Sequence, residues 1–260
     1  MSCFVSLRLR GKNFKLTQHP DSFTLHKSFA FMSTSSVVDS QNGFKELRVQ
    51  DNPQHPAAKV GATILSYIFH PIFVPVYIVA FLVYVHPFLF IGFSGKQKLQ
   101  TLIQAILMYS FFPLITVLLL KALAFIPTIY LKTQKERYIP LIASMTCSFW
   151  MWNVWKNLPE YPHEAVVFAF AAFMATIIAW LANIYMKVSL HAISMGVLIA
   201  FLFHLAFIQD LNFGIYLSVA LLIAGLVCTA RFIVSDHTAK EIYGGLAGGI
   251  IAVLIANWFV

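Results

Sequence analysis

Long apolar stretches alternate with short polar connections over most of this chain. Seven stretches carry at most one charged residue each, and they cover residues 62–93, 99–126, 139–155, 165–186, 192–208, 214–234 and 241–259. A helix needs about 20 apolar residues to cross the hydrocarbon core of a bilayer, which is about 30 Å thick. The pattern therefore predicts an all-α fold, a polytopic transmembrane helix bundle with about seven apolar segments.

Proline and glycine residues modify three of these segments. His70-Pro71 and Pro75 interrupt the first, which predicts a kink or a re-entrant turn, and Pro113 predicts a kink in the second. The last segment contains two overlapping pairs of small residues at a spacing of four, formed by Gly244, Gly245, Gly248 and Gly249. Because such pairs let a neighbouring helix approach closely, we expect the last helix to be central.

Residues 1–60 have a different character. They hold 12 of the 28 charged residues, and they lack a helical apolar period. Such a segment cannot bury enough apolar surface to offset the entropy of ordering, so we expect a disordered basic tail over 1–60 and the helical bundle over 61–260. The first thirty residues carry a single acid, Asp21, which fits either a transit peptide or a chain that starts at Met32.

Composition narrows the class of protein. The chain is 59% hydrophobic and 11% charged with a mean hydropathy of +0.77, which excludes a soluble domain and predicts an integral, multi-pass membrane protein. Half of the net charge of +8 lies in the tail, and no basic stripe with interleaved aromatic residues is present, so nucleic acid is not an expected partner. The three scattered cysteines imply no disulfide framework.

Five ionisable residues stand at the ends of apolar segments: Arg137, His191, Arg231, His237 and Glu241. Titratable groups at membrane depth cost several kcal/mol unless they are paired or hydrated, so they mark a candidate site. With seven crossings, the connections alternate between the two sides of the membrane. The stretches 130–139, 187–190 and 235–240 then share one face, where all five residues are predicted to meet.

The spacing of the last three residues favours phosphate chemistry. Glu241 follows His237 by four residues, one helical turn, so its carboxylate can orient the imidazole and stabilise its charged form. Arg231 offers a planar, permanently charged fork for phosphate. Taken singly, His237 and Glu241 also fit an ion pair at a helix start, Arg231 a snorkelling side chain, and Ser189 a helix N-cap.

Three short motifs carry a resemblance to a known family. They are Lys132-Thr-Gln-Lys-Glu-Arg137-Tyr-Ile-Pro140, Val188-Ser-Leu-His191, and Arg231 followed by His237 and Glu241. Their order and spacing resemble the type 2 phosphatidic acid phosphatase superfamily over residues 130–260. Leu190 and Glu241 stand where the family pattern has glycine and aspartate.

The resemblance implies a six-helix core and a location in a bacterial inner membrane. It also implies a role for each of the candidate residues. His237 is the expected nucleophile, His191 the general acid and Glu241 the residue that orients the nucleophile. The expected phosphate-binding residues are Arg137, Arg231, Lys132, Lys135 and Ser189. No metal ion or cofactor is implied.

The predicted function is hydrolysis of a phosphomonoester or diphosphate on a lipid, with a lipid phosphate and the bilayer as partners. One alternative is a relative without catalytic activity that binds lipid phosphate. Another is a transporter that uses His and Glu as a proton relay. A zinc site formed by His191, His237 and Glu241 is a further alternative, while His70, His86 and His204 are expected to be packing or interfacial residues.

Overall fold

The computed structural model describes residues 55–131, 133–208, 212–234 and 237–260, together with four short strands nearer the N-terminus. The chain divides into two units, Met1–Pro53 and Gln54–Val260. In the first unit the strands form two antiparallel pairs, β1 (Arg8–Leu9) with β2 (Lys12–Asn13) and β3 (Ser35–Val38) with β4 (Phe44–Leu47). The disorder predicted for 1–60 falls mostly outside the described residues.

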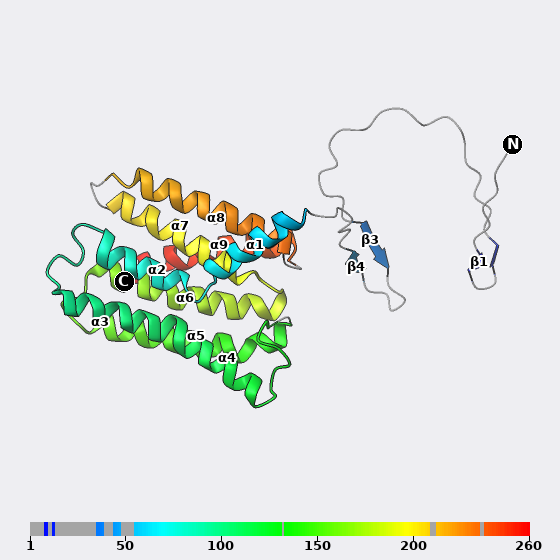
Figure 1. Cartoon of the computed structure of the whole chain (residues 1–260), viewed down its shortest axis with the longest axis horizontal. Helices are drawn as coiled ribbons and strands as arrows, with labels where there is room; N and C mark the ends of the chain where they lie inside the picture. Colours follow the sequence, from blue (N-terminus) through cyan, green and yellow to red (C-terminus); the bar gives the residue numbers. More distant parts are fainter. Residues whose placement is uncertain are drawn as a thin grey trace. The chain divides into compact units, whose positions relative to one another are not determined.

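The second unit is helical throughout its described residues. Its elements are α1 (Pro56–Ile68), α2 (Val74–Ala80), the π-helix η1 (Phe81–Val85), α3 (Gly95–Ala105), the π-helix η2 (Ile106–Phe111), α4 (Phe112–Ala122), α5 (Gln134–Lys156), α6 (His163–Tyr185), α7 (Leu190–Ile208), α8 (Gly214–Val234) and α9 (Ala239–Phe259). Figure 1 shows the long helices side by side in a bundle. The predicted all-α class is confirmed for this unit.

Five helical stretches within the described residues are long and apolar enough to cross a membrane: Gly95–Ala122, α6, α7, α8 and α9. This is consistent with the predicted integral membrane protein. The first apolar segment is split into helices too short to cross, and the 23-residue helix α5 opens on the polar residues Lys135, Glu136 and Arg137. The prediction of seven segments is therefore supported for five.

The break predicted at the first proline site is present, and the kink predicted at Pro113 stays a prediction. The first apolar segment breaks at His70-Pro71, between the end of α1 and the start of α2. In the second, Pro113 has no N–H to donate to the carbonyl of Tyr109, four residues earlier. The π-helix η2 ends just before this point, where the amide of Phe112 bonds to the carbonyl of Leu107, and Pro113 lies in the first turn of α4.

Helix α9 packs against both α6 and α7, and in Figure 1 it runs behind α2 through the middle of the bundle. A Cβ atom added at Gly245 would lie 2.8 Å from the carbonyl oxygen of Ser189, and one added at Gly249 would collide with that of Ile193. At Gly248 it would lie 3.0 Å from the side chain of Ile178. The predicted close approach and central position of this helix are confirmed.

Candidate functional site

Hydrogen bonds join the three motif segments at one end of the bundle. Arg137 Nη1 donates to the carbonyl of Val188 at 3.0 Å, which ties the start of α5 to the loop before α7. The amide of Ser189 donates to the carbonyl of Glu241 at 3.2 Å, which ties that loop to α9. These bonds confirm the prediction that the three segments share one face.

The buried side chain of Arg137 holds two loops together through hydrogen bonds to their main chains. Its Nε donates to the carbonyl of Leu131 at 3.0 Å, and Leu131 has the left-handed φ of 47° that non-glycine residues rarely adopt. With the bond to Val188, two of its N–H groups are held by main-chain oxygens, so the side chain fixes two loops. A guanidinium has about five N–H groups, which leaves about three for the cavity that Arg137 lines.

His237 and Glu241 form the predicted pair. His237 Nδ1 lies 3.0 Å from Glu241 Oε2, and because a carboxylate only accepts, the ring proton is on Nδ1 and Nε2 keeps its lone pair. The same oxygen accepts the amide of Thr238 at 2.9 Å, while Thr238 Oγ1 accepts the amide of Glu241 at 3.3 Å. Glu241 therefore orients the histidine and closes the capping box of α9 at the same time.

The protonation state of His237 follows from its surroundings. The side chain is 4% exposed, and burial lowers the pKa of its imidazole to about 4. The hydrogen bond to Glu241 opposes this lowering of the pKa, and the positive charges of Arg137 and Arg231 add to it. His237 is therefore neutral at pH 7, with an unprotonated Nε2.

His191 stands at the start of α7. Its Nε2 lies 3.0 Å from the carbonyl oxygen of Ser66, in the last turn of α1. A carbonyl oxygen only accepts, so this nitrogen carries a proton and Nδ1 is the nitrogen that can exchange one with a ligand. To act as a general acid, His191 has to take up a second proton, on Nδ1.

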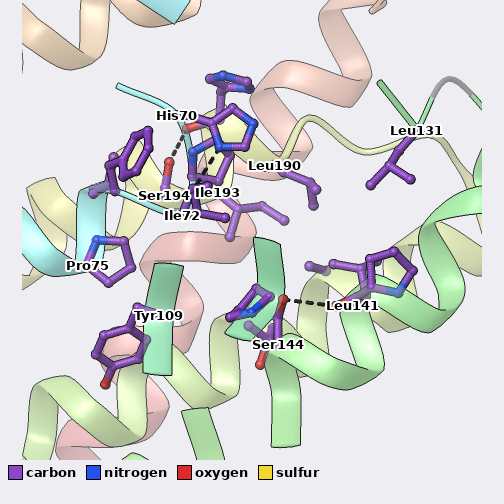
Figure 2. A pocket seen from close by; sticks show the side chains of 18 of the residues that line it. His70, Ile72, Pro75, Tyr109, Leu131, Leu141, Ser144, Leu190, Ile193 and Ser194 are labelled. Carbon is purple, nitrogen blue, oxygen red and sulfur yellow. Dashed lines mark hydrogen bonds between the residues drawn. The ribbon is translucent and has the colours of Figure 1, made fainter. Parts of the chain in front are cut away.

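Arg137, His191, Arg231 and His237 line a cavity of about 710 Å³, and Glu241 is not part of its lining. Its basic lining residues belong to the loop end of the bundle: His70, Arg137, Lys187, His191, Arg231 and His237. Apolar side chains such as Ile78, Leu114, Leu141, Phe168 and Val197 line the rest. Figure 2 shows His70 and Ser194 on one side of the cavity and Tyr109 and Ser144 on the other. The volume falls within the range of about 300–1,000 Å³ that is usual for ligand pockets.

The other predicted phosphate-binding residues lie elsewhere. Ser189 is fully buried outside the cavity lining, and its Oγ accepts the amide of Ala192 at 3.5 Å, as an N-cap does. Lys135 is exposed on the first turn of α5, also outside the lining. Lys132 lies outside the described residues. Phosphate binding by these three residues stays a prediction.

Sequence reasoning missed two cavity residues, His70 and Lys187. His70 was expected to be a packing or interfacial residue. Its ring lines the cavity and faces that of His191 edge to face, with centroids 5.3 Å apart and an interplanar angle of 81°. The available signal was a titratable residue at a proline break in an apolar segment. His86 is buried against Phe81 and Phe213, which fits the packing role expected of it.

Within the described residues, no group of three or more His, Cys, Asp or Glu side chains is placed to hold a metal ion. Comparison of the chain with protein-family models, curated proteins and solved structures gives no match. The geometry of the cavity is therefore the basis for any functional inference.

Proposed function

We propose that this protein is a membrane-embedded lipid phosphatase that hydrolyses a phosphomonoester or diphosphate on a lipid. The observation that carries the proposal is the state of His237: a buried neutral imidazole, held through Nδ1 by Glu241, that lines a cavity with cationic side chains at one end and apolar walls beyond them. A histidine held in this way is an activated nucleophile. Phosphoryl transfer otherwise requires chiefly positioning and compensating positive charge.

The proposed reaction has two steps. The lone pair of His237 Nε2 attacks phosphorus, an N–P bond forms, and the bond from phosphorus to the lipid oxygen breaks. That oxygen takes the proton from Nδ1 of a protonated His191 ring, the form that the negative charge of the bound phosphate favours. His191 then removes a proton from water, whose oxygen attacks phosphorus, so that the N–P bond breaks, phosphate leaves and His237 is restored. Arg137 and Arg231 compensate the charge on the phosphate oxygens.

The edge of the cavity supports a lipid ligand. Several apolar or aromatic side chains that line it are also at least 37% exposed: Tyr67, Phe73, Leu114, Leu118, Ile129 and Tyr130. They come from α1, the turn after it, α4 and the loop before α5. A cavity bordered by exposed apolar side chains on a bundle of this kind opens toward lipid chains. The phosphate is then held at the cationic end while the chains extend toward the bilayer.

The architecture of the proposal includes a six-helix core. From Gly95 onward the described chain contains six consecutive long helical stretches, of which α5 is the one outside the five apolar spans. We take α5 as the sixth crossing, with its polar first turn at the membrane surface, and α1 and α2 as a broken segment beside the core. A bacterial inner membrane is the proposed location.

Release of inorganic phosphate tests the proposal. The purified full-length chain in detergent micelles is given phosphatidate and a polyprenyl diphosphate, and phosphate is measured over time. We expect release by the unmutated protein and none by His237→Ala. His204→Ala, which changes a buried histidine of α7 outside the cavity lining, is the control and should retain activity.

The burial of Ser189 favours one second candidate, a protein that binds lipid phosphate without hydrolysing it. Its hydroxyl accepts the amide of Ala192 and lies outside the lining of the cavity, so the proposed site lacks one of the expected phosphate-binding residues. Binding of phosphatidate without any release of phosphate by the unmutated chain would establish this second function in place of the first.

A further inference from the structure

The turn between α1 and α2 is built around His70. The amides of Phe73 and Val74 donate to its carbonyl oxygen at 2.8 and 3.3 Å, and the amide of Ile72 donates to its ring Nδ1 at 3.4 Å. Pro71 has no amide proton of its own. The turn therefore occupies the carbonyl oxygen and one ring nitrogen of His70, and it sets the direction of the other ring nitrogen.

A second element holds this turn in place. Ser110 Oγ, buried in η2, donates to the carbonyl of Ile72 at 2.7 Å. Ser110 belongs to the π-helical turn that precedes Pro113, and π-helical turns are frequent at functional sites. His70 is thus positioned by its own turn and, through Ile72, by a helix from another part of the chain.

The donor chemistry of His70 follows from these bonds. A backbone amide only donates, so Nδ1 accepts and the proton of the neutral ring is on Nε2. Within the described part of the chain, Nε2 has no hydrogen-bond partner. The ring lines the cavity beside His191, and the positive charge of Arg231 acts on both rings. His70 therefore presents a fixed, uncharged N–H group at the cationic end of the cavity.

We propose that His70 is a phosphate-binding residue, whose Nε2–H group donates a hydrogen bond to an oxygen of the lipid phosphate. This inference rests on the proposed function only in that the cavity takes a lipid phosphate; it does not require hydrolysis. His70 adds an uncharged donor beside the cationic side chains of Arg137 and Arg231. Two N–H groups of Arg137 are already bonded to main-chain carbonyls, so Arg137 has fewer donors for a ligand. The N–H group of His70 supplies a further donor.

The chain contains a natural control in its second His-Pro turn. His86 Nδ1 accepts the amides of Phe88 and Leu89 at 3.3 and 3.2 Å, so the two histidines share the same turn chemistry. His86, however, is buried between aromatic rings outside the lining of this cavity. Substitutions at His86 therefore report on the loss of a comparable His-Pro turn outside the lining of the cavity.

The test compares two substitutions in the full-length chain. His70→Gln keeps a side-chain N–H donor but removes the ring, whereas His70→Phe keeps a ring against His191 but removes the donor. The affinity for dioctanoyl phosphatidate is measured by calorimetry in detergent micelles. A hydrogen bond to a charged group predicts that His70→Phe weakens binding about tenfold to a hundredfold, while His70→Gln stays within about threefold of the unmutated chain.

The controls separate donation from packing. His86→Phe and His86→Gln should leave the affinity unchanged, and dioctanoylglycerol, which lacks the phosphate, should not distinguish the two His70 variants. Thermal unfolding in the same detergent verifies that each variant is folded. Binding that is retained by His70→Phe and lost by His70→Gln would overturn the inference, because it would assign the ring a packing role.

Failure of the proposed function has a different signature. An unmutated chain that binds dioctanoyl phosphatidate but releases no phosphate overturns the phosphatase and leaves the role of His70 supported by the affinity pattern. An unmutated chain that does not bind this lipid at all overturns both.

Discussion

The amide of Ser189 donates a hydrogen bond to the carbonyl oxygen of Glu241, with the two atoms 3.2 Å apart. Ser189 precedes His191 by two residues, and Glu241 follows His237 by four. The two histidines of the proposed reaction therefore stand on elements that are joined by their main chains. A shift of α9 along α7 would change the separation of the two rings, so activity depends on how these helices pack.

The first prediction concerns that packing. Gly249→Ala places a Cβ atom against the carbonyl oxygen of Ile193 and 2.8 Å from the amide nitrogen of Val197. We expect a loss of about 1–3 kcal/mol in the free energy of unfolding, because main-chain atoms cannot move aside as a flexible side chain can. The melting temperature in detergent measures this loss.

Gly225→Ala on α8 is the matched control, because nothing lies within 4 Å of the Cβ atom it would add. It should raise the melting temperature slightly or leave it unchanged, since alanine has the higher helix propensity. Equal melting temperatures for the two variants would contradict the close approach of α7 and α9.

A second prediction separates the two tasks of Glu241. Glu241→Gln keeps an oxygen that can accept from His237 or Thr238 but removes the negative charge. We expect little change in the melting temperature and a rate of phosphate release between those of the unmutated chain and His237→Ala. Glu241→Ala should in addition lose about 0.5–2 kcal/mol of stability, because the cap of α9 is lost. A Gln variant with an unchanged rate would refute the role of the charge.

The third prediction distinguishes the two histidines by the leaving group. An aryl phosphate has a low-pKa leaving group that needs little protonation, so it should restore much of the activity that His191→Ala loses on an alkyl lipid phosphate. His237→Ala should stay inactive on both substrates, because it lacks the nucleophile. Phosphate release at matched protein levels, with detection of phosphohistidine after a quench without acid, measures the difference. Equal losses on the aryl substrate would exclude these roles.

The fourth prediction concerns pH and stability. Burial lowers the pKa of His237 to about 4 in the folded protein, below its ordinary value of about 6.5. Between these values the unfolded chain binds more protons than the folded one, so the contribution of His237 to stability is present above pH 6.5 and is lost as the pH falls toward 4. The slope is at most about 1.4 kcal/mol per pH unit.

Melting temperatures between pH 7 and pH 4.5 measure this contribution. His237→Gln, which does not titrate, should show a shallower decline than the unmutated chain. The difference between the two curves isolates His237 from the other buried histidines. Parallel curves would show that His237 is protonated equally in both states.

The sequence predicted the features that depend on local pattern. The apolar stretch 214–234 coincides with α8, and the spacing of His237 and Glu241 gives the bond found between their side chains. The common face of the three motif segments followed from counting crossings, although the first stretch is broken into short helices. The breaks in the first apolar stretch do not alter its hydropathy, and the polar first turn of α5 lies before the apolar stretch 139–155. For these two reasons the count of seven exceeded the five helices that qualify.

The features that escaped prediction depend on partners far away in the chain. His70 and His191 are 121 residues apart, and no periodicity connects them. Arg137 was expected to hold phosphate, but its contact with Val188 spans 51 residues. The sequence around Ser189 fits either a helix N-cap or a donor to a ligand. The direction of its hydroxyl depends on how α7 packs against α9, which the sequence does not give.

The contact between Ser66 and His191 joins an early helix of the chain to a later one, which has a consequence for the order of assembly during biosynthesis. Helix α1, which leaves the ribosome first among the helices described here, packs against α8 and supplies the carbonyl that fixes the proton on His191. His237 and its carboxylate partner are among the last residues to be synthesised. The site can therefore be assembled only after the final helix has inserted and the first has docked on those that follow it. A chain released early by a truncated message would carry His191 and most of the cavity wall, yet it would lack the pair of His237 and Glu241.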